Sequence, residues 1–357
     1  MIVIVAGALA LCGCGGLARA GPGARSETSA RDPGMPASQH FRFFAPTSFW
    51  NKPTPPDASL DPSSAAVIGG LAAAIANGRA TGLGPTASID TSSYSVPIYT
   101  VPATQPTVSV RLAKALAIPS LSRAWRAVPL PPGAQPARGS DAELVVWQPS
   151  SDRLWEFWRL ARTSAGWQAA FGGAMRRVSR DRGVYSREAW PGAGSGWGAS
   201  ASSLPIVGGL ITFEDLRAGE INHALAMSVP DVRAGAWALP AARTDGRSQD
   251  PLSLPEGAHL RLDPSLALGS LHLPRLTLMI AQAAQRYGIF IRDTSPNVGF
   301  YAQDPTPTGS DPYGGPHGYF EGLSTPALLA AFPWSHLQLL RMQLRSRRAP
   351  GSEGSRR

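Results

Sequence analysis

Residues Ala201–Val229 read ASSLPIVGGLITFEDLRAGEINHALAMSV. Within them, Thr212-Phe213-Glu214-Asp215 has the spacing of a capping box, so it predicts a short helix that ends at Gly219. The residues from Ile221 to Val229 then predict a strand. One face of this strand would carry His223, Leu225, Met227 and Val229. The stretch therefore predicts a turn, a short helix and a central strand, with His223 at the rim of a site.

The composition of the 357-residue chain favours short strands over long helices. Hydrophobic residues make up 43% and charged residues 16%, and there are 38 Gly and 34 Pro. So many turn-forming residues interrupt helices and suit strands that are joined by turns. Ten Trp in a charge-poor chain fit a sandwich or a barrel. We predict a mainly β protein, a jelly-roll-like β-sandwich with a few peripheral helices.

The two ends of the chain differ in composition from its middle. Residues 1–11 form an apolar run that is too short to span a bilayer and matches an export signal. Leu11-Cys12-Gly13-Cys14 resembles a bacterial lipobox with Cys14 as the lipidation site, although no Lys or Arg precedes the run; an ordinary cleaved signal is the alternative. We expect an extracytoplasmic protein, anchored to the cell membrane by lipid or secreted. The predicted organisation is an export signal at 1–14, a disordered tether at 15–40, a single β-rich domain at 41–346 and a basic tail at 347–357.

The charge pattern and the missing motifs exclude several classes of function. The net charge is +9, but residues 341–357 alone hold six Arg and one Glu, so we expect no nucleic-acid partner. Both cysteines lie in the first 14 residues, so the body has no disulfide, thiolate metal site or Cys nucleophile. Nucleotide-binding, nucleophile-elbow and zinc-protease motifs are missing from the sequence. We expect no cofactor and no metal site, with Ca²⁺ held by loop carboxylates as the open alternative.

Capping residues, apolar periodicity and turn signals place the remaining elements. The predicted helices run from Asp61 to about Asn77 with Gly78 as the stop, from Pro274 to Tyr287, and over about 335–346. The predicted strands form a hairpin of Glu143–Gln148 and Leu154–Ala161, and a last pair of Ile289–Asp293 and Val298–Gln303. Asp245-Gly246 is interpreted as a turn.

Three polar residues interrupt apolar strand faces and are the candidate catalytic residues: Glu156, His223 and Asp293. Burying a carboxylate costs free energy and raises its pKa, which suits a general acid. Each residue also has a structural alternative. Glu156 would then pair with a neighbouring arginine or lie at a solvated sheet edge, His223 would be a satisfied core histidine, and Asp293 would form a turn.

If the three strands are neighbours, Glu156 and Asp293 would flank a bond as acid and base, as glycoside hydrolysis requires, with His223 assisting. A histidine with a tyrosine would instead suit a polysaccharide lyase. The candidate substrate-binding residues are Trp155, Trp158, Asn222, Tyr301 and Tyr313. The first hypothesis is thus a glycan-cleaving enzyme whose partner is a polysaccharide or a cell-wall glycan. The alternative is a non-catalytic glycan-binding or structural envelope lipoprotein.

Several segments of the chain resemble a largely uncharacterised family of exported actinobacterial proteins. They run through most of the body and comprise Ser48–Asn51, Trp155–Trp158, Leu204–Leu210, Asn222–Leu225 and Tyr301–Gln303. The resemblance implies a relation to carbohydrate-active β-sandwich proteins. It brings no established catalytic residues with it, so none are transferred to this chain.

Overall fold

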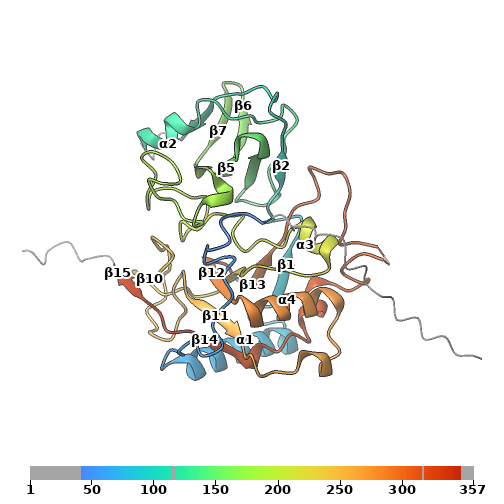
Figure 1. The fold of residues 1–357 in the computed structure, drawn as a ribbon. Helices are drawn as coiled ribbons and strands as arrows, with labels where there is room; N and C mark the ends of the chain where they lie inside the picture. Colours follow the sequence, from blue (N-terminus) through green and yellow to red (C-terminus); the bar gives the residue numbers. More distant parts are fainter. Residues whose placement is uncertain (1–41, 114–117, 316, 347–357) are drawn as a thin grey trace, which may run out of the picture. The chain divides into compact units, whose positions relative to one another are not determined.

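The computed structural model describes residues 42–113, 118–315 and 317–346. The predicted export signal with Cys14, the predicted tether and the predicted basic tail lie outside these residues. The chain from His40 onward forms one unit, which contains several sheets and few long helices (Figure 1).

A mixed sheet of six strands organises the part of the molecule that is lowest in Figure 1. Its strands, in spatial order, are β1 (Ala87–Asp90), β13 (Val298–Tyr301), β9 (Leu225–Val229), β12 (Ile289–Thr294), β11 (His259–Leu262) and β14 (Leu337–Leu339). β9 runs parallel to β12 and antiparallel to β13. It therefore lies inside the sheet, and all five of its residues are buried.

Helices cover one face of this sheet. α1 (Ser64–Thr81) packs beside β14, α4 (Arg275–Arg286) beside β11, and α5 (Thr325–Leu329) beside β1. The helices share a hydrophobic cluster with alternate residues of the inner strands, among them Leu225, Met227, Val229, Ile289 and Ile291. The strand period that the sequence shows therefore decides which side chains meet the helices.

The predicted helix after Asp61 is confirmed, but its end lies further along the chain. α1 passes Gly78 and ends at Thr81, and the C-cap residue Gly82 has a left-handed backbone (φ 69°). A Cβ atom at Gly78 would lie 2.1 Å from the Pro85 carbonyl oxygen. Gly78 therefore allows the chain at Pro85 to pack closely against α1, and it does not end the helix.

The predicted helix at 335–346 is wrong, whereas the one at Pro274–Tyr287 is confirmed as α4. The C-terminal segment forms a 3₁₀ turn, η4 (Trp334–His336), followed by β14 and β15 (Leu344–Ser346). Leu337 and Leu339 are buried with a polar residue between them, and they pair with β11. A period of two therefore governs this segment.

A second sheet, of four strands, lies in the upper part of Figure 1. Its spatial order is β2 (Ile98–Thr100), β4 (Leu144–Gln148), β5 (Arg153–Trp158) and β8 (Phe171–Arg176). β4 and β5 are the predicted hairpin, joined by η1 (Pro149–Ser151). The smaller elements are β3 (Val110–Leu112), β6 (Ala161–Thr163), β7 (Gly166–Ala169), β10 (Ala236–Ala238), α2 (Pro119–Ala124), η2 (Val178–Arg180) and η3 (Leu268–Ser270).

A second hydrophobic cluster joins the two large sheets. Ala226, Phe290 and Tyr301, on the sheet face opposite the helices, belong to the same cluster as the core of the four-stranded sheet. Trp197 and Ile206 also belong to it. They place the Gly/Ser-rich segment 195–206 against both sheets, and we call this segment the bridging loop.

The strand-rich organisation with several sheets is confirmed. Strands pair in parallel in three of the sheets, as β1–β13, β9–β12, β2–β4 and β3–β7. A jelly roll is built from antiparallel strands. Among the described residues, no helix is both long and apolar enough to cross a membrane.

The capping box predicted in the opening stretch is confirmed. The Asp215 carboxylate accepts the Thr212 N–H at 2.8 Å, and the Thr212 hydroxyl accepts the Asp215 N–H at 3.3 Å. These bonds start α3 (Phe213–Ala218), which ends at Gly219 as predicted. The strand that follows is shorter than predicted, because β9 begins at Leu225 and His223 lies in the loop before it.

Candidate functional site

Glu156 lies in the middle of β5 and is completely buried. Its Oε1 accepts the Ala199 N–H at 2.7 Å, and its Oε2 accepts the Ile206 N–H at 2.8 Å. Burial raises the pKa of Glu156, and these two hydrogen bonds offset part of the rise. Both carboxylate oxygens are thus used to fix the bridging loop. The partners are backbone amides and not the neighbouring arginine that the structural alternative suggested.

The neighbour of Glu156 across the sheet explains how the carboxylate is enclosed. Gly173 pairs with Glu156 on β8. A Cβ atom at Gly173 would lie 2.4 Å from the Tyr185 hydroxyl oxygen. The glycine therefore makes room for the buried Tyr185 ring, whose hydroxyl also lowers the pKa of Glu156. A substrate has no path to Glu156 through this packing.

His223 is paired with Asp215. Its Nε2 lies 3.1 Å from Asp215 Oδ2, and its Nδ1 lies 2.9 Å from the Ala224 carbonyl oxygen. Burial alone would lower the pKa of His223, but the carboxylate and the carbonyl outweigh it and raise the pKa above its usual value. Because both ring nitrogens face acceptors, the geometry favours the doubly protonated ring, which has no lone pair to act as a base.

Asp215 lies eight residues before His223, and the sequence did not single it out as the partner of the histidine. The signal for Asp215 was present in its capping box. The capping box uses only part of the hydrogen-bonding capacity of the Asp215 carboxylate, so a further donor can approach it. α3 turns the chain back between Asp215 and His223, and the two side chains meet for that reason.

Asp293 lies near the end of β12, just after an irregularity in its pairing with β9. Its Oδ2 accepts the Ala201 N–H at 3.2 Å, and its Oδ1 accepts the Thr294 N–H at 2.9 Å. Burial raises the pKa of Asp293 to about 6, and the hydrogen bond from Ala201 opposes this rise. Asp293 thus holds the bridging loop from the six-stranded sheet, as Glu156 does from the four-stranded sheet.

The structure does not bring the three candidate catalytic residues to one cleft. Glu156 and Asp293 contact the same loop, but each does so through backbone amides. His223 lines a pocket of about 20 Å³, beside Arg42 and Asn51. That volume is too small for a sugar ring, since it holds about one water molecule.

The five candidate substrate-binding residues are occupied by other parts of the protein. Trp155 is buried and donates to the Ala124 carbonyl, and Trp158 donates to Asp141 while Arg159 lies over its ring. Tyr301 is buried beneath the Arg292 guanidinium, 3.5 Å from its ring centre, and Asn222 accepts the Tyr287 hydroxyl. Tyr313 is buried and donates to the Gln303 carbonyl at 2.8 Å. These residues support the fold.

A groove of about 460 Å³ lies between the edge of the four-stranded sheet and α3. We call it the aromatic groove. Its lining residues are Phe43, Ile98, Tyr99, Thr100, Trp147, Pro149, Thr212, Phe213, Glu214, Arg217, Gln303, Pro307 and Thr308. Most of these residues come from β2, β4, α3 and the segment after β13. These segments lie far apart in the sequence, so they form the groove only when the chain folds.

The aromatic groove combines ring surfaces with hydrogen-bonding groups. Phe43 and Trp147 meet edge to face at 5.6 Å, and the half-buried Tyr99 and Phe213 complete the apolar surface. Glu214 and Arg217 form a salt bridge of 2.7 Å on the wall. The groove is therefore amphipathic and has no strong charge of its own.

Three carboxylates come close together at a different place. Asp245, Glu256 and Asp293 each have an oxygen within 4.8 Å of the others; we call them the acidic cluster. Burial raises the pKa of Glu256 to about 9. Asp245 lines a polar pocket of about 510 Å³, which Asp231, Arg247 and Thr294 also line. Among the described residues, these three are the ones that could hold a metal ion.

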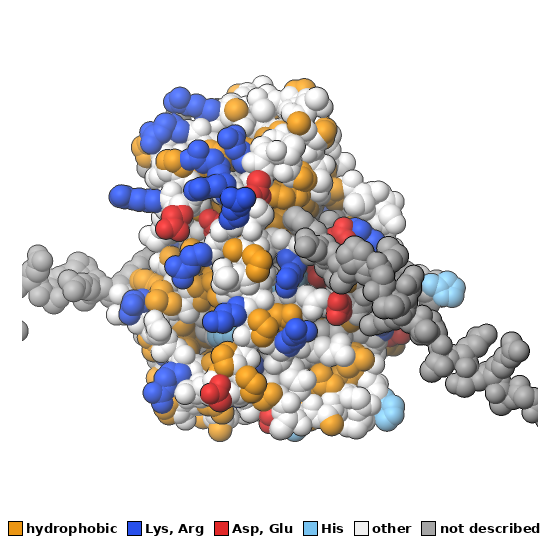
Figure 2. Space-filling model, viewed as in Figure 1, with side chains coloured by type: hydrophobic (Ala, Val, Ile, Leu, Met, Phe, Trp, Pro, Cys, Tyr) orange, Lys and Arg blue, Asp and Glu red, His pale blue; other side chains and the backbone are white. Residues whose placement is uncertain are grey.

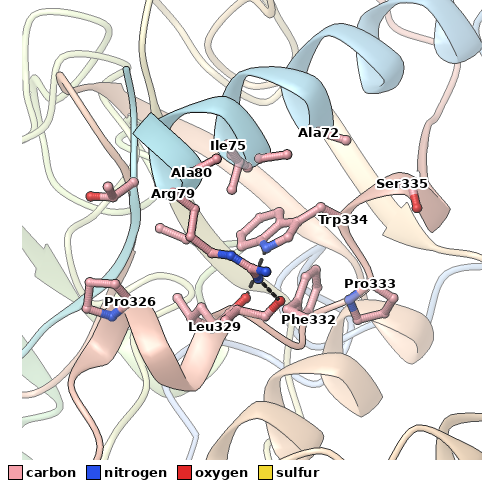
Figure 3. A pocket seen from close by; sticks show the side chains of 14 residues that line it. Ala72, Ile75, Arg79, Ala80, Pro326, Leu329, Phe332, Pro333, Trp334 and Ser335 are labelled. Atoms are coloured by element: carbon pink, nitrogen blue, oxygen red, sulfur yellow. Dashed lines mark hydrogen bonds between the residues drawn. The ribbon is translucent and has the colours of Figure 1, made fainter. Parts of the chain in front are cut away.

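Another pocket, of about 440 Å³, lies between α1 and α5 and is mostly apolar (Figure 3). Arg79 points into it, but its guanidinium donates to the Ala330 carbonyl at 2.9 Å. Trp334, on the opposite wall, donates to the Leu329 carbonyl. Arg79 and Trp334 are thus hydrogen-bonded to the walls of this pocket, and no carboxylate or histidine among the described residues lines it.

The surface view adds a charge pattern that the sequence does not reveal. In Figure 2, Lys and Arg side chains gather over the upper left, where Figure 1 shows α2 and β7. Among the described residues, arginines also lie over tryptophan rings, as Arg162 of β6 does over Trp167 and Arg176 of β8 over Trp190. The positive charge is therefore not confined to the C-terminal tail.

Comparison with known proteins does not assign the chain to a family. No family model matches it, and neither a curated protein nor a solved structure shows significant similarity to it. Any function must therefore be inferred from the site geometry.

Proposed function

We propose that the protein is a non-catalytic carbohydrate-binding protein that holds a glycan chain in the aromatic groove. The observation that supports this proposal most is the combination of the half-buried Tyr99 and Phe213 with polar wall residues in a groove of about 460 Å³, whose floor includes the buried Trp147. Sugar rings have apolar faces and polar edges, so a groove with ring surfaces and hydrogen-bonding walls suits them.

The proposal extends to location, on sequence grounds alone. We propose that the protein acts outside the cytoplasm and is attached to the membrane through a lipid on Cys14. The resemblance to exported actinobacterial proteins agrees with this, as does an envelope or environmental glycan as the partner. The proposed glycan binding depends on the aromatic groove and is independent of whether the fold is a jelly-roll-like β-sandwich.

Glycan cleavage is the second candidate. Glu156 and His223 are buried and hydrogen-bonded within the protein, which argues against the acid/base roles that the sequence suggested for them. One observation favours cleavage: Asp293, with a pKa of about 6, lies beside the exposed Asp245 at the polar pocket. Two carboxylates in different environments are what an acid/base pair needs.

A binding panel with groove variants tests the proposal. Purified protein is titrated with neutral and acidic polysaccharides, and new reducing ends and unsaturated sugars are measured in the same samples. Phe213→Ala should weaken binding at least tenfold, which is about 1.4 kcal/mol. The matched control is Phe320→Ala, because both rings are half-buried and pack against Tyr313, at 5.9 and 5.3 Å, but only Phe213 lines the groove.

The outcomes separate the two candidates. Equal binding by the Phe213→Ala and Phe320→Ala variants would contradict the proposal that the glycan binds in the aromatic groove. Release of reducing ends by the wild type, lost in Asp293→Asn, would favour cleavage instead.

A further inference from the structure

The acidic cluster contains a carboxylate without a partner. Glu256 is completely buried, and neither of its oxygens makes a hydrogen bond with the described residues. The Thr244 hydroxyl and the Asp245 N–H approach it and lower its pKa in part, without completing a hydrogen bond. A buried carboxylate normally has a partner, because leaving it unpaired costs several kcal/mol.

The nearest cation does not fill this role. Arg243 is close enough to act electrostatically on Glu256 and Asp293. However, its guanidinium donates to backbone carbonyls of the bridging loop, those of Ser195, Gly198, Ser200 and Ala201. Among the described residues, no Lys, Arg or His nitrogen forms a salt bridge with any of the three carboxylates. The carboxylate oxygens therefore face one another.

We infer that Asp245, Glu256 and Asp293 form a binding site for a divalent cation, and that the cation is Ca²⁺. All three ligands are carboxylates, and oxygen ligands are those that Ca²⁺ prefers. The charges agree with a divalent ion. Three ionised carboxylates carry three negative charges, and the nearby Arg243 and Arg292 guanidiniums donate to backbone carbonyls instead of to these oxygens, so a divalent ion would supply the positive charge in contact with them.

The position of the cluster suits Ca²⁺ better than Mg²⁺. The ligands come from two separate segments and from different depths, with Glu256 buried, Asp293 half-buried and Asp245 exposed at the polar pocket. Ca²⁺ takes six to eight ligands in flexible geometry, whereas Mg²⁺ needs a near-ideal octahedron. The open pocket beside Asp245 gives room for water ligands.

A bound ion would add a further link between segments that lie far apart in the sequence. It would link the irregular chain around Asp245 to Glu256, before β11, and to Asp293 on β12. Asp293 also accepts the Ala201 N–H, so the ion would stabilise the bridging loop as well. The site is independent of the aromatic groove, because the two share no lining residue.

The test is a thermal melt of the full-length protein after EDTA treatment and buffer exchange, with CaCl₂ or MgCl₂ added back. Ca²⁺ at about 100 times its dissociation constant should raise Tm by about 5 °C, because it binds the folded state alone. Mg²⁺ should give a smaller shift at the same concentration. Calorimetric titration of the wild type should show one site, and absence of both binding heat and a Tm shift would overturn the proposal.

Variants locate the site. Glu256→Gln and Asp293→Asn should each abolish the Ca²⁺-dependent shift. Asp231→Asn is the matched control, because Asp231 is an exposed acid on the wall of the same pocket but not a cluster member, and it should keep the full shift. A shift that survives in Glu256→Gln, or one that is lost in Asp231→Asn, would contradict this assignment.

Discussion

Glu156 and Glu256 are both completely buried glutamates, yet their surroundings are opposite. Glu156 has a backbone N–H on each oxygen, at 2.7 and 2.8 Å. Glu256 has no hydrogen bond to either oxygen from the described residues. The Glu156 carboxylate fixes the bridging loop by its two hydrogen bonds. The Glu256 carboxylate has hydrogen-bonding capacity that the described residues do not use. Burial of a carboxylate therefore does not by itself identify a functional site.

The surroundings of Glu156 and Glu256 differ in whether the protein supplies hydrogen-bond donors to the buried carboxylate. The same distinction separates His223, which has acceptors on both nitrogens, from a residue that awaits a ligand. It also explains why we propose the acidic cluster as a ligand site, and not Glu156 or His223.

The largest effect should come from Glu156→Ala. The substitution leaves the Ala199 and Ile206 N–H groups buried without acceptors and creates a cavity, so the free energy of unfolding should fall by about 4 kcal/mol. Denaturant unfolding measures it. Glu156→Gln keeps one acceptor oxygen and should lose less than half as much. A loss below about 1 kcal/mol for Glu156→Ala would mean that the bridging loop does not depend on this carboxylate.

A smaller loss, about 2 kcal/mol, should follow Asp215→Asn, because the ion pair with His223 is removed while the amide can still cap α3. The folded pKa of His223 is raised above its reference value of 6.5. The pair therefore stabilises the fold fully below that value, and its contribution is lost as the pH rises through the folded pKa.

The difference between wild type and Asp215→Asn should accordingly be largest below pH 6.5 and should shrink above it. NMR titration of His223 should show a lower pKa in the variant. The control is Glu214→Gln, which breaks an exposed salt bridge and should cost less than about 1 kcal/mol. An unchanged His223 pKa in Asp215→Asn would break the assignment of the pair.

The environment of His259 is the reverse of that of His223. Burial lowers the pKa of His259 from 6.5 to about 4, and the ring stacks on Phe290 at 4.1 Å. The unfolded chain binds the proton more readily, so stability should fall as the pH drops from about 6.5 to about 4, by on the order of 1–3 kcal/mol. In His259→Gln this part of the pH dependence should disappear, and an identical slope would contradict it.

Much of the local structure followed from the sequence, because local rules decide it. The capping box at Thr212, the hairpin of β4 and β5, and α4 each depend on residues close together in the chain. The burial of Glu156 also followed from strand alternation. The C-terminal helix was wrong because a short apolar segment suits either a helix or a strand until its partner is known.

The two proposed sites did not follow from the sequence, because both are built from distant segments. The aromatic groove joins residues from Phe43 to Thr308. The acidic cluster joins Asp245, interpreted as a turn, with Glu256 and Asp293, and it exists because β11 and β12 pair side by side. The irregular chain around Asp245 and Glu256, before β11, shows no apolar periodicity that would predict an inward-facing carboxylate.

The contrast between the two glutamates is tested most directly by the Ca²⁺-dependent Tm shift of Glu156→Gln and Glu256→Gln, measured side by side with the wild type. We predict that Glu156→Gln has a lower Tm but keeps the shift of about 5 °C, and that Glu256→Gln loses the shift. Loss of the shift in Glu156→Gln, or its persistence in Glu256→Gln, would contradict the account.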